Sequence, residues 1–316
     1  MKLKIILLLG FLFLLYINYE TTEGYSNGRI TKNYVIEILS KEEGMKVMGN
    51  LKNVNNYNDR EISARSKFKV HIKVNENKKS EMKDMYVNNV MNFTKDEKQS
   101  ITDGVNYLFS KFYKKVPLIG RWKFIKLNNI MDWGYPFTIG DYIVMPSERI
   151  SMNVEVLART LFHEQMHIIQ RKEPKIFQDF FEKHWNFKKY NLPDDPWINE
   201  YLVRNPDSDD FYIYKITDEL NLLPLPTTYD KHYRFTESAI FLTNNLKILA
   251  KGEEPYIVPL RQVADYVTRF YNVKSLYHPN EIISEILTDM LFNDLSVSEI
   301  DHNSLNDLFK MLKQYS

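Results

Sequence analysis

Two histidines and a glutamate form a His-Glu-x-x-His sequence at His163, Glu164 and His167. Apolar residues recur at helical spacing over residues 154–169, so this motif is predicted to lie on an α-helix. Histidines four positions apart project from the same helix face and can bind one metal ion. Glu164 then lies close enough to take a proton from a water at that ion without binding the ion itself. The pattern is typical of a zinc hydrolase.

A second helix is predicted further along the chain, over about residues 279–293. Pro279 suits the first turn of a helix, and Glu281 and Glu285 then lie one turn apart on a common face. Catalytic zinc sites have three protein ligands and leave a fourth position for water. Either carboxylate can supply the third ligand, and His278 is a further alternative. Because the chain has no cysteine, histidine and carboxylate must supply all the zinc ligands.

Together the two helices resemble those of the gluzincins, the thermolysin-like group of zinc metallopeptidases. In that family the His-Glu-x-x-His helix is followed by a helix with Asn-Glu-x-x-Ser-Asp, and the corresponding segment here reads Asn-Glu-Ile-Ile-Ser-Glu. The resemblance implies that His163, His167 and Glu281 bind Zn²⁺. It also implies that Glu164 is the general base and that Glu285 orients a ligand histidine. It covers these two helices and the strand before the first.

The fold is predicted to be α+β and, by the same resemblance, zincin-like: mainly helical, with a small antiparallel sheet before the His-Glu-x-x-His helix. Residues 122–127 have the pattern of a strand, and residues 136–146 have that of a hairpin. Residues 211–216 and 222–225 are predicted to pair as a ribbon. In zincins the strand before the metal-binding helix lies above the metal and pairs with an extended substrate by β-augmentation. A peptide or protein is therefore the expected substrate.

Composition divides the 316 residues into three parts. Residues 1–20 combine lysines with the apolar run 5–17, which indicates a secretory signal peptide or a signal anchor. The residues after 20 are then expected on the non-cytoplasmic side, either secreted or held at a membrane through residues 5–17. Residues 21–66 are polar and asparagine-rich and are expected to form a stalk. Residues 67–316 are expected to form the catalytic domain.

The balance of charge argues against nucleic acid as a partner. The chain has 42 basic and 41 acidic residues, a net charge of +1, and no block of basic residues. Two alternatives to a peptidase stay open. One is a zincin-fold protein without turnover that serves as a membrane-associated structural or binding protein. The other is a zinc hydrolase of non-peptide amides or esters.

Peptide hydrolysis at this site would use Glu164 as the base. Zinc lowers the pKa of a water, and Glu164 takes the proton from that water and passes it to the leaving amine. A further donor must stabilise the negative oxygen that develops on the carbonyl. No motif identifies that donor, and the candidates are Tyr212, Tyr214, His232, Tyr271 and Tyr277.

Overall fold

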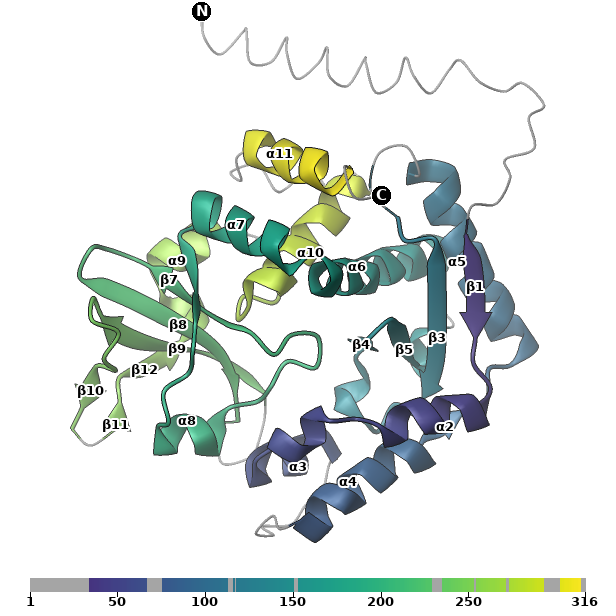
Figure 1. The fold of residues 1–316 in the computed structure, drawn as a ribbon, viewed down its shortest axis with the longest axis horizontal. Helices are drawn as coiled ribbons and strands as arrows, with labels where there is room; N and C mark the ends of the chain where they lie inside the picture. The colour runs from purple at the N-terminus through teal and green to yellow at the C-terminus, as the bar shows by residue number, and fades with distance from the viewer. Residues whose placement is uncertain are drawn as a thin grey trace, which may run out of the picture. The chain divides into compact units, whose positions relative to one another are not determined.

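Two five-stranded sheets, with helices between and around them, make up the described part of the chain in a computed structural model (Figure 1). The described residues are 34–66, 76–112, 116, 118–150, 153–228, 235–252, 254–270, 273–292 and 302–313. The predicted signal segment lies outside them. The chain divides into Met1–Val35 and Ile36–Ser316, and the description below concerns the second unit by itself. Within the described residues, no helix combines the length and the apolar character needed to cross a membrane.

The first sheet is mixed. Its strands are β1 (Val35–Ile38), β2 (Val90–Met91), β3 (Arg121–Leu127), β4 (Phe137–Ile139) and β5 (Tyr142–Pro146). The strand order is β1-β3-β5-β4, and β2 also pairs with β3. β3 and β5 run parallel, whereas β4 runs antiparallel to β5 and forms an edge of the sheet. The strand and the hairpin predicted in this region are both present, but the sheet that they join is not purely antiparallel.

Helices cover both faces of the first sheet. They are α2 (Lys41–Gly49), α3 (Asp59–Ser66), α4 (Glu76–Asn88) and α5 (Lys95–Phe112). On one face Ile125 and Val144 share a core cluster with Met82 of α4. On the other face Trp122 packs edge to face against Phe109 of α5, with ring centroids 6.4 Å apart. Alternate residues of β3 therefore face two different helical layers, as the pleat of a strand requires.

Residues 36–66 differ from the polar stalk expected over residues 21–66. They fold into the end of β1, α2, η1 (Asn53–Asn56) and α3. A capping box between Ser40 and Glu43 starts α2. Their buried side chains in the core of the first sheet are Leu39, Met48, Leu51, Val54, Tyr57 and Ile62. The mean polarity of the segment concealed these apolar residues, which lie between asparagines and lysines but fall on the faces that point toward the sheet.

The second sheet is antiparallel and has the order β12-β9-β8-β7-β6. Its strands are β6 (Phe187–Tyr190), β7 (Phe211–Lys215), β8 (Leu220–Thr227), β9 (Thr236–Thr243) and β12 (Ile257–Pro259). The predicted ribbon is its β7–β8 pair. Pro224 and Pro226 weaken the strand signal of β8, because proline cannot donate a ladder hydrogen bond. They are tolerated because β8 pairs with β7 only near Asn221 and Leu222.

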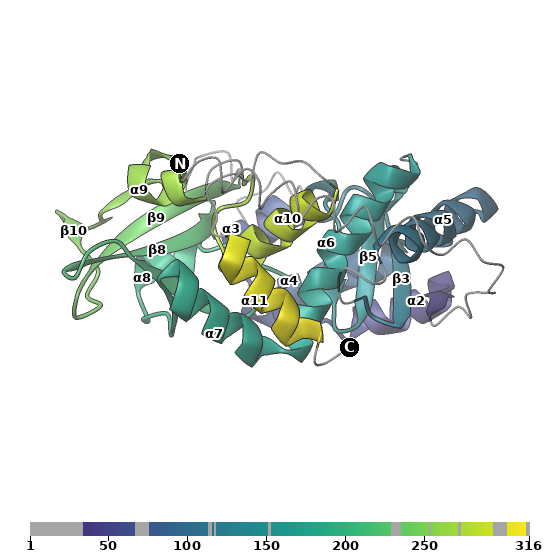
Figure 2. The same ribbon diagram turned by 90° about the horizontal axis from the view of Figure 1, so that it is seen from above.

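The remaining elements surround the second sheet and join it to the first. They are η2 (Asp132–Gly134), η3 (Ser147–Arg149), α6 (Val154–Lys172), α7 (Pro174–Trp185), α8 (Pro196–Tyr201), β10 (Ala250–Lys251), β11 (Glu254–Pro255), η4 (Leu260–Gln262), α9 (Ala264–Arg269), α10 (Pro279–Leu291) and α11 (His302–Lys313). Trp197 and Ile198 of α8 pack on the sheet beside Leu223 and Ile240. In both ribbon views α6 and α10 lie between the two sheets (Figure 1, Figure 2).

Candidate metal centre and active site

Close packing against α5 fixes the position of α6. An added Cβ on Gly104 of α5 would lie 3.1 Å from Leu161 Cδ1 and 3.3 Å from Leu157 Cγ, so the helices meet there without room for a larger residue. Leu157 and Leu161 are fully buried. The face of α6 that carries His163 and His167 is turned away from this contact. The helix is therefore held from behind while its two imidazoles point into the space between the sheets.

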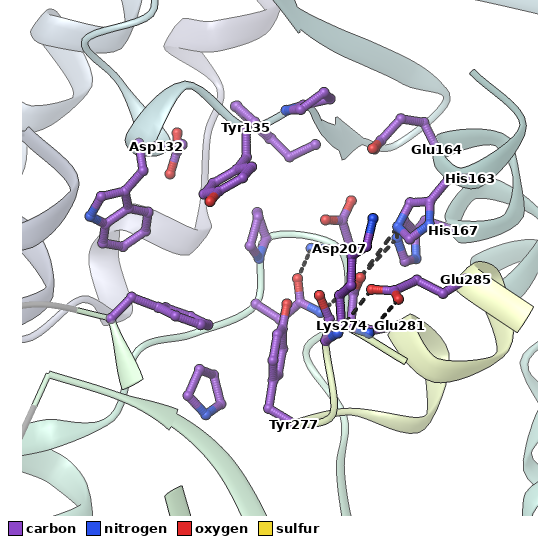
Figure 3. A pocket seen from close by; sticks show the side chains of 18 of the residues that line it. Asp132, Tyr135, His163, Glu164, His167, Asp207, Lys274, Tyr277, Glu281 and Glu285 are labelled. Atoms are coloured by element: carbon purple, nitrogen blue, oxygen red, sulfur yellow. Dashed lines mark hydrogen bonds and ion pairs between the residues drawn. The ribbon is translucent and has the colours of Figure 1, made fainter. Parts of the chain in front are cut away.

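Glu281 of α10 completes a triangle of possible metal ligands with the two histidines (Figure 3). His163 Nε2 and His167 Nε2 are 3.1 Å apart, and they lie 3.4 Å and 3.5 Å from Glu281 Oε2. A tetrahedral zinc ion with bonds of about 2.0–2.1 Å holds its ligand atoms about 3.3–3.4 Å apart. The three atoms thus have the spacing that one zinc ion requires.

Gln170 holds His167 in the orientation that a metal ligand needs. His167 Nδ1 is 2.9 Å from Gln170 Oε1, so an N–H on Nδ1 donates to that oxygen and leaves Nε2 free to bind a metal. The amide nitrogen of Gln170 donates to Asn280 O and to Ser284 Oγ, each at 3.0 Å. Gln170 is one turn beyond His167 on α6 and therefore ties the ligand helix to α10. Sequence reasoning gave this orienting role to Glu285.

Replacing Gln170 with alanine is expected to weaken zinc binding by about 10- to 100-fold, the range for lost partners of ligand histidines. The reason is that His167 then loses the acceptor that fixes its tautomer and ring angle. Competition with a chromophoric zinc chelator measures the affinity. Gln178→Ala on α7, where Gln178 bonds only Glu182 at the surface, is the matched control and should leave the affinity unchanged. Equal affinities for both variants would contradict the role of Gln170.

Asn205 orients the third ligand. Its Nδ2 donates to Glu281 Oε1 at 2.8 Å, while its Oδ1 accepts the N–H of Asp207 at 2.9 Å. One carboxylate oxygen of Glu281 is thereby held by an amide, and the other faces the histidines. Asn205 and Glu281 are both buried, at 7% and 6% exposure, so the bond between them is shielded from water. No sequence motif links Asn205 to Glu281, because the contact joins residues that are far apart in the chain.

Without a metal ion, the triangle favours a positive charge at its centre. Burial by itself lowers the pKa of His167, but Glu281 and Asp207 outweigh it and raise that pKa to about 10. Burial raises the pKa of Glu281, and His167 outweighs it and holds the pKa well below its usual range. The metal-free site therefore contains an imidazolium beside a carboxylate. A proton takes the place that a metal cation would occupy.

Zinc affinity is accordingly expected to rise with pH. Zinc requires the neutral imidazole, and the raised pKa of His167 means that its proton must leave when the metal binds near neutral pH. Zinc binding at pH 7 should release about one proton or more per chain. Calorimetric titration in buffers of different ionisation enthalpy counts these protons. A zinc affinity that does not change between pH 6 and pH 8, with no proton released, would contradict the coupling.

Glu164 lies at the centre with one free oxygen. It is 5% exposed, and among the described residues its Oε2 has no hydrogen-bond partner. Burial, and then the negative charge of Asp207, raise the pKa of Glu164 to about 7. A carboxyl group with a pKa near neutrality can both accept and return a proton at physiological pH. A divalent cation at the triangle would favour its ionised form, which is the form that a general base requires.

The edge strand β4 is partly covered. Thr138 donates to Asp207 Oδ1 from its main-chain N–H, at 2.7 Å, and from its hydroxyl. Arg171 of α6 donates to Gly140 O at 2.8 Å and to Asp207 O at 2.9 Å. The outward main-chain groups of Thr138 and Gly140 are thus already bonded. In this conformation a substrate strand cannot pair with β4 at these two positions, although the sequence predicts β-augmentation here.

Glu285 and His278 have other partners. Glu285 accepts the main-chain N–H groups of Lys274 and Ser275, at 2.6 Å and 2.9 Å, and so holds the loop before α10. His278 is the N-cap of α10: its Nδ1 accepts the N–H of Asn280, and its Nε2 donates to Asp210 O at 3.0 Å. Both ring nitrogens of His278 are used in these bonds. The orienting role expected for Glu285 therefore belongs to Gln170, and His278 is not placed as a metal ligand.

Of the five candidates for an oxyanion donor, Tyr277 is the one that lines the cavity at the metal centre. Burial, and then the charge of Glu281, raise the pKa of Tyr277 well above its ordinary value, so its hydroxyl keeps the proton that a donor needs. Tyr212 packs edge to face on His278, and Tyr214 packs on Tyr266. His232 and Tyr271 lie outside the described residues.

The metal centre opens into a cavity of about 730 Å³. Glu164, Asp207 and Glu281 line it on the side of α6 and α10, and Tyr135 and Trp133 line it on the side of the first sheet (Figure 3). A cavity of this size is in the range that holds a small ligand or a few residues of a peptide. No protein-family model, no curated protein and no solved structure matches the chain. The site is therefore interpreted from its own geometry.

Proposed function

We propose that the chain is a zinc-dependent metallopeptidase of gluzincin type. The observation that carries the proposal is the triangle of His163, His167 and Glu281, whose ligand atoms are 3.1–3.5 Å apart beside the free carboxylate oxygen of Glu164. Three nitrogen and oxygen ligands with an open fourth position are what a catalytic zinc site needs. The open side faces a cavity large enough for a substrate.

The arrangement of elements also supports a zincin-like fold. The α+β chain places a mixed sheet with the antiparallel edge strand β4 just before the helix that carries both histidines. The glutamate comes from a later helix, α10, that contacts this helix. The resemblance seen in the sequence of the two helices thus extends to their position beside a sheet.

In the proposed reaction, zinc would supply Lewis acidity toward a water molecule and toward the substrate carbonyl. Glu164 accepts a proton from the attacking water through Oε2 and delivers it to the leaving amine. Tyr277 is placed to donate a hydrogen bond to the carbonyl oxygen as negative charge develops there. Gln170 and Asn205 hold His167 and Glu281 in place, so the ligand geometry need not reorganise during the reaction.

One observation favours a second candidate, hydrolysis of non-peptide amides or esters. Extended peptides bind zincins by pairing with the edge strand, and the outward groups of Thr138 and Gly140 are occupied. A compact substrate would not need that strand. The metal ligands and Glu164 would have the same roles in this reaction, so the two candidates differ only in what the cavity accepts.

The test is metal dependence together with substrate class. The purified chain should contain one zinc ion, lose peptide hydrolysis after dialysis against a chelator, and regain it with one equivalent of zinc. Parallel assays with internally quenched peptides and with simple N-acyl amides and esters separate the two candidates. A chain that binds no zinc, or that hydrolyses peptides equally well without it, would contradict the proposal. Secretion or membrane attachment through residues 1–20 is a separate proposal, which fractionation of the expressing cells tests.

A further inference from the structure

The cavity has an aromatic end that the zinc chemistry does not use. Four aromatic side chains from separate segments line it: Trp133 of η2, Tyr135 after η2, Phe235 before β9 and Tyr277 before α10. Phe235 is 41% exposed and Tyr135 is 60% exposed, so large apolar surfaces remain open there. Exposed aromatic residues that line a cavity are a common feature of ligand sites.

The rings of this aromatic end contact one another edge to face. Trp133 and Phe235 have ring centroids 5.9 Å apart at 64°, and Phe235 and Tyr277 have centroids 5.6 Å apart at 76°. Such T-shaped contacts are favourable and leave ring faces uncovered. The chain of rings links the first sheet to the segment before α10, and its last member, Tyr277, lies beside the metal centre. The aromatic end and the zinc triangle therefore belong to one continuous cavity.

A strained backbone holds Trp133 in place. Asp132, Trp133 and Gly134 have φ angles of 47°, 55° and 72°, all in the left-handed region that non-glycine residues rarely adopt. Buried Arg65 bonds Asp132, and its guanidinium carbon lies 5.5 Å from the centre of the Trp133 ring. Backbone strain of this kind persists where surrounding contacts enforce it, and it occurs most often at functional sites.

Charge selects among the possible occupants of this end. Arg65 already lies over Trp133, and the guanidinium carbon of Arg149 lies 5.6 Å from the centre of the Tyr135 ring. A lysine or arginine side chain of a substrate would meet these cations, whereas a neutral ring would meet apolar faces and edges. Main-chain pairing is also blocked at Thr138 and Gly140 of β4. Recognition must then come mainly from a side chain.

We propose that the side chains of Trp133, Tyr135, Phe235 and Tyr277 form a specificity subsite for an aromatic side chain of the substrate residue next to the scissile amide. The proposal rests on the proposed function, because the zinc triangle defines where that amide lies. Burial of one additional ring among these side chains sets the selectivity.

The test measures inhibitor binding, which does not require turnover. N-acetyl amino-acid hydroxamates, which bind zinc, are titrated calorimetrically into the zinc-loaded full chain with phenylalanine, alanine, lysine or aspartate side chains. The phenylalanine compound should bind at least about tenfold more tightly than the other three. Phe235→Ala and Tyr135→Ala, both at exposed positions, should each reduce this preference at least about threefold without changing the affinity for the alanine compound.

Tyr256→Ala is the matched control. Tyr256 is 42% exposed and stacks on Phe241, outside the residues that line the cavity, so its loss should leave the preference intact. Equal affinity for all four compounds, or a preference that both cavity variants retain, would overturn the subsite while leaving the zinc peptidase proposal standing. Selective binding without any peptide hydrolysis would support the subsite and contradict the peptidase. Failure of every hydroxamate to bind would contradict both.

Discussion

Replacing Glu164 with glutamine is expected to lower kcat/KM for peptide hydrolysis by about 100- to 10,000-fold, the usual contribution of a general base. Glutamine has nearly the same shape but cannot accept the proton of the attacking water. Because Glu164 is not one of the three atoms of the zinc triangle, the variant should still bind one zinc ion per chain. Steady-state kinetics and metal analysis of the same preparation measure both quantities.

The control for Glu164 lies on the same helix. Glu155 is exposed in the first turn of α6, and Glu155→Gln removes a charge without entering the cavity. Its kcat/KM should match that of the unmodified chain. Full peptidase activity of Glu164→Gln would show that another group takes the proton. If the biological activity of the chain is unaffected by Glu164→Gln, the alternative of a zincin-fold protein without turnover gains support.

Replacing Arg65 with methionine is expected to lower the free energy of unfolding by about 3–5 kcal/mol. The guanidinium bonds Glu61 Oε1 at 3.0 Å and 2.9 Å and also bonds Asp132 and the main-chain oxygen of Arg204. All these side chains except that of Arg204 are almost completely buried. Methionine would leave two carboxylates without their central cation. Urea unfolding followed by circular dichroism measures the loss.

Arg60 supplies a comparison within the same helix. Its ion pair with Glu200 at 3.1 Å is partly exposed, with side-chain exposures of 23% and 54%. Arg60→Met should cost about 1 kcal/mol or less, because solvent screens such pairs. Similar small losses for Arg60→Met and Arg65→Met would show that the buried carboxylates are protonated or hydrated and need no cation. Since Arg65 also supports the strained turn at Trp133, its loss should weaken the aromatic end of the cavity as well.

The parts of the site that sequence predicted depend on local geometry. The spacing of His163 and His167 on a helix fixes their common face, and Pro279 marks the start of the helix that brings Glu281. The strand and the hairpin before α6 were also visible in their alternation. Gln170 had a weaker signal: it lies on the histidine face of α6, but nothing local shows whether its amide meets an imidazole or solvent.

Tertiary contacts determine the remainder. Asn205 bonds Glu281, and Asp207 bonds Thr138, across 76 and 69 positions of the chain. No periodicity reports such contacts, and the aspartates near Asp207 have the composition of an ordinary turn. The burial of Leu51 and Val54 in a polar, asparagine-rich segment has the same explanation. A side chain there is buried because α4 and the first sheet lie over it, and that placement is a property of the folded chain.

The cover over β4 has a consequence for association between molecules. An open edge strand offers its N–H and C=O groups to a strand of another chain, which is a common start of aggregation. Here Asp207 and Arg171 occupy those groups at Thr138 and Gly140, and both place charges along the edge. A second molecule that approached this edge would meet bonded polar groups and a charged rim. The sheet is thereby protected along β4 against growth by strand addition from a neighbouring copy.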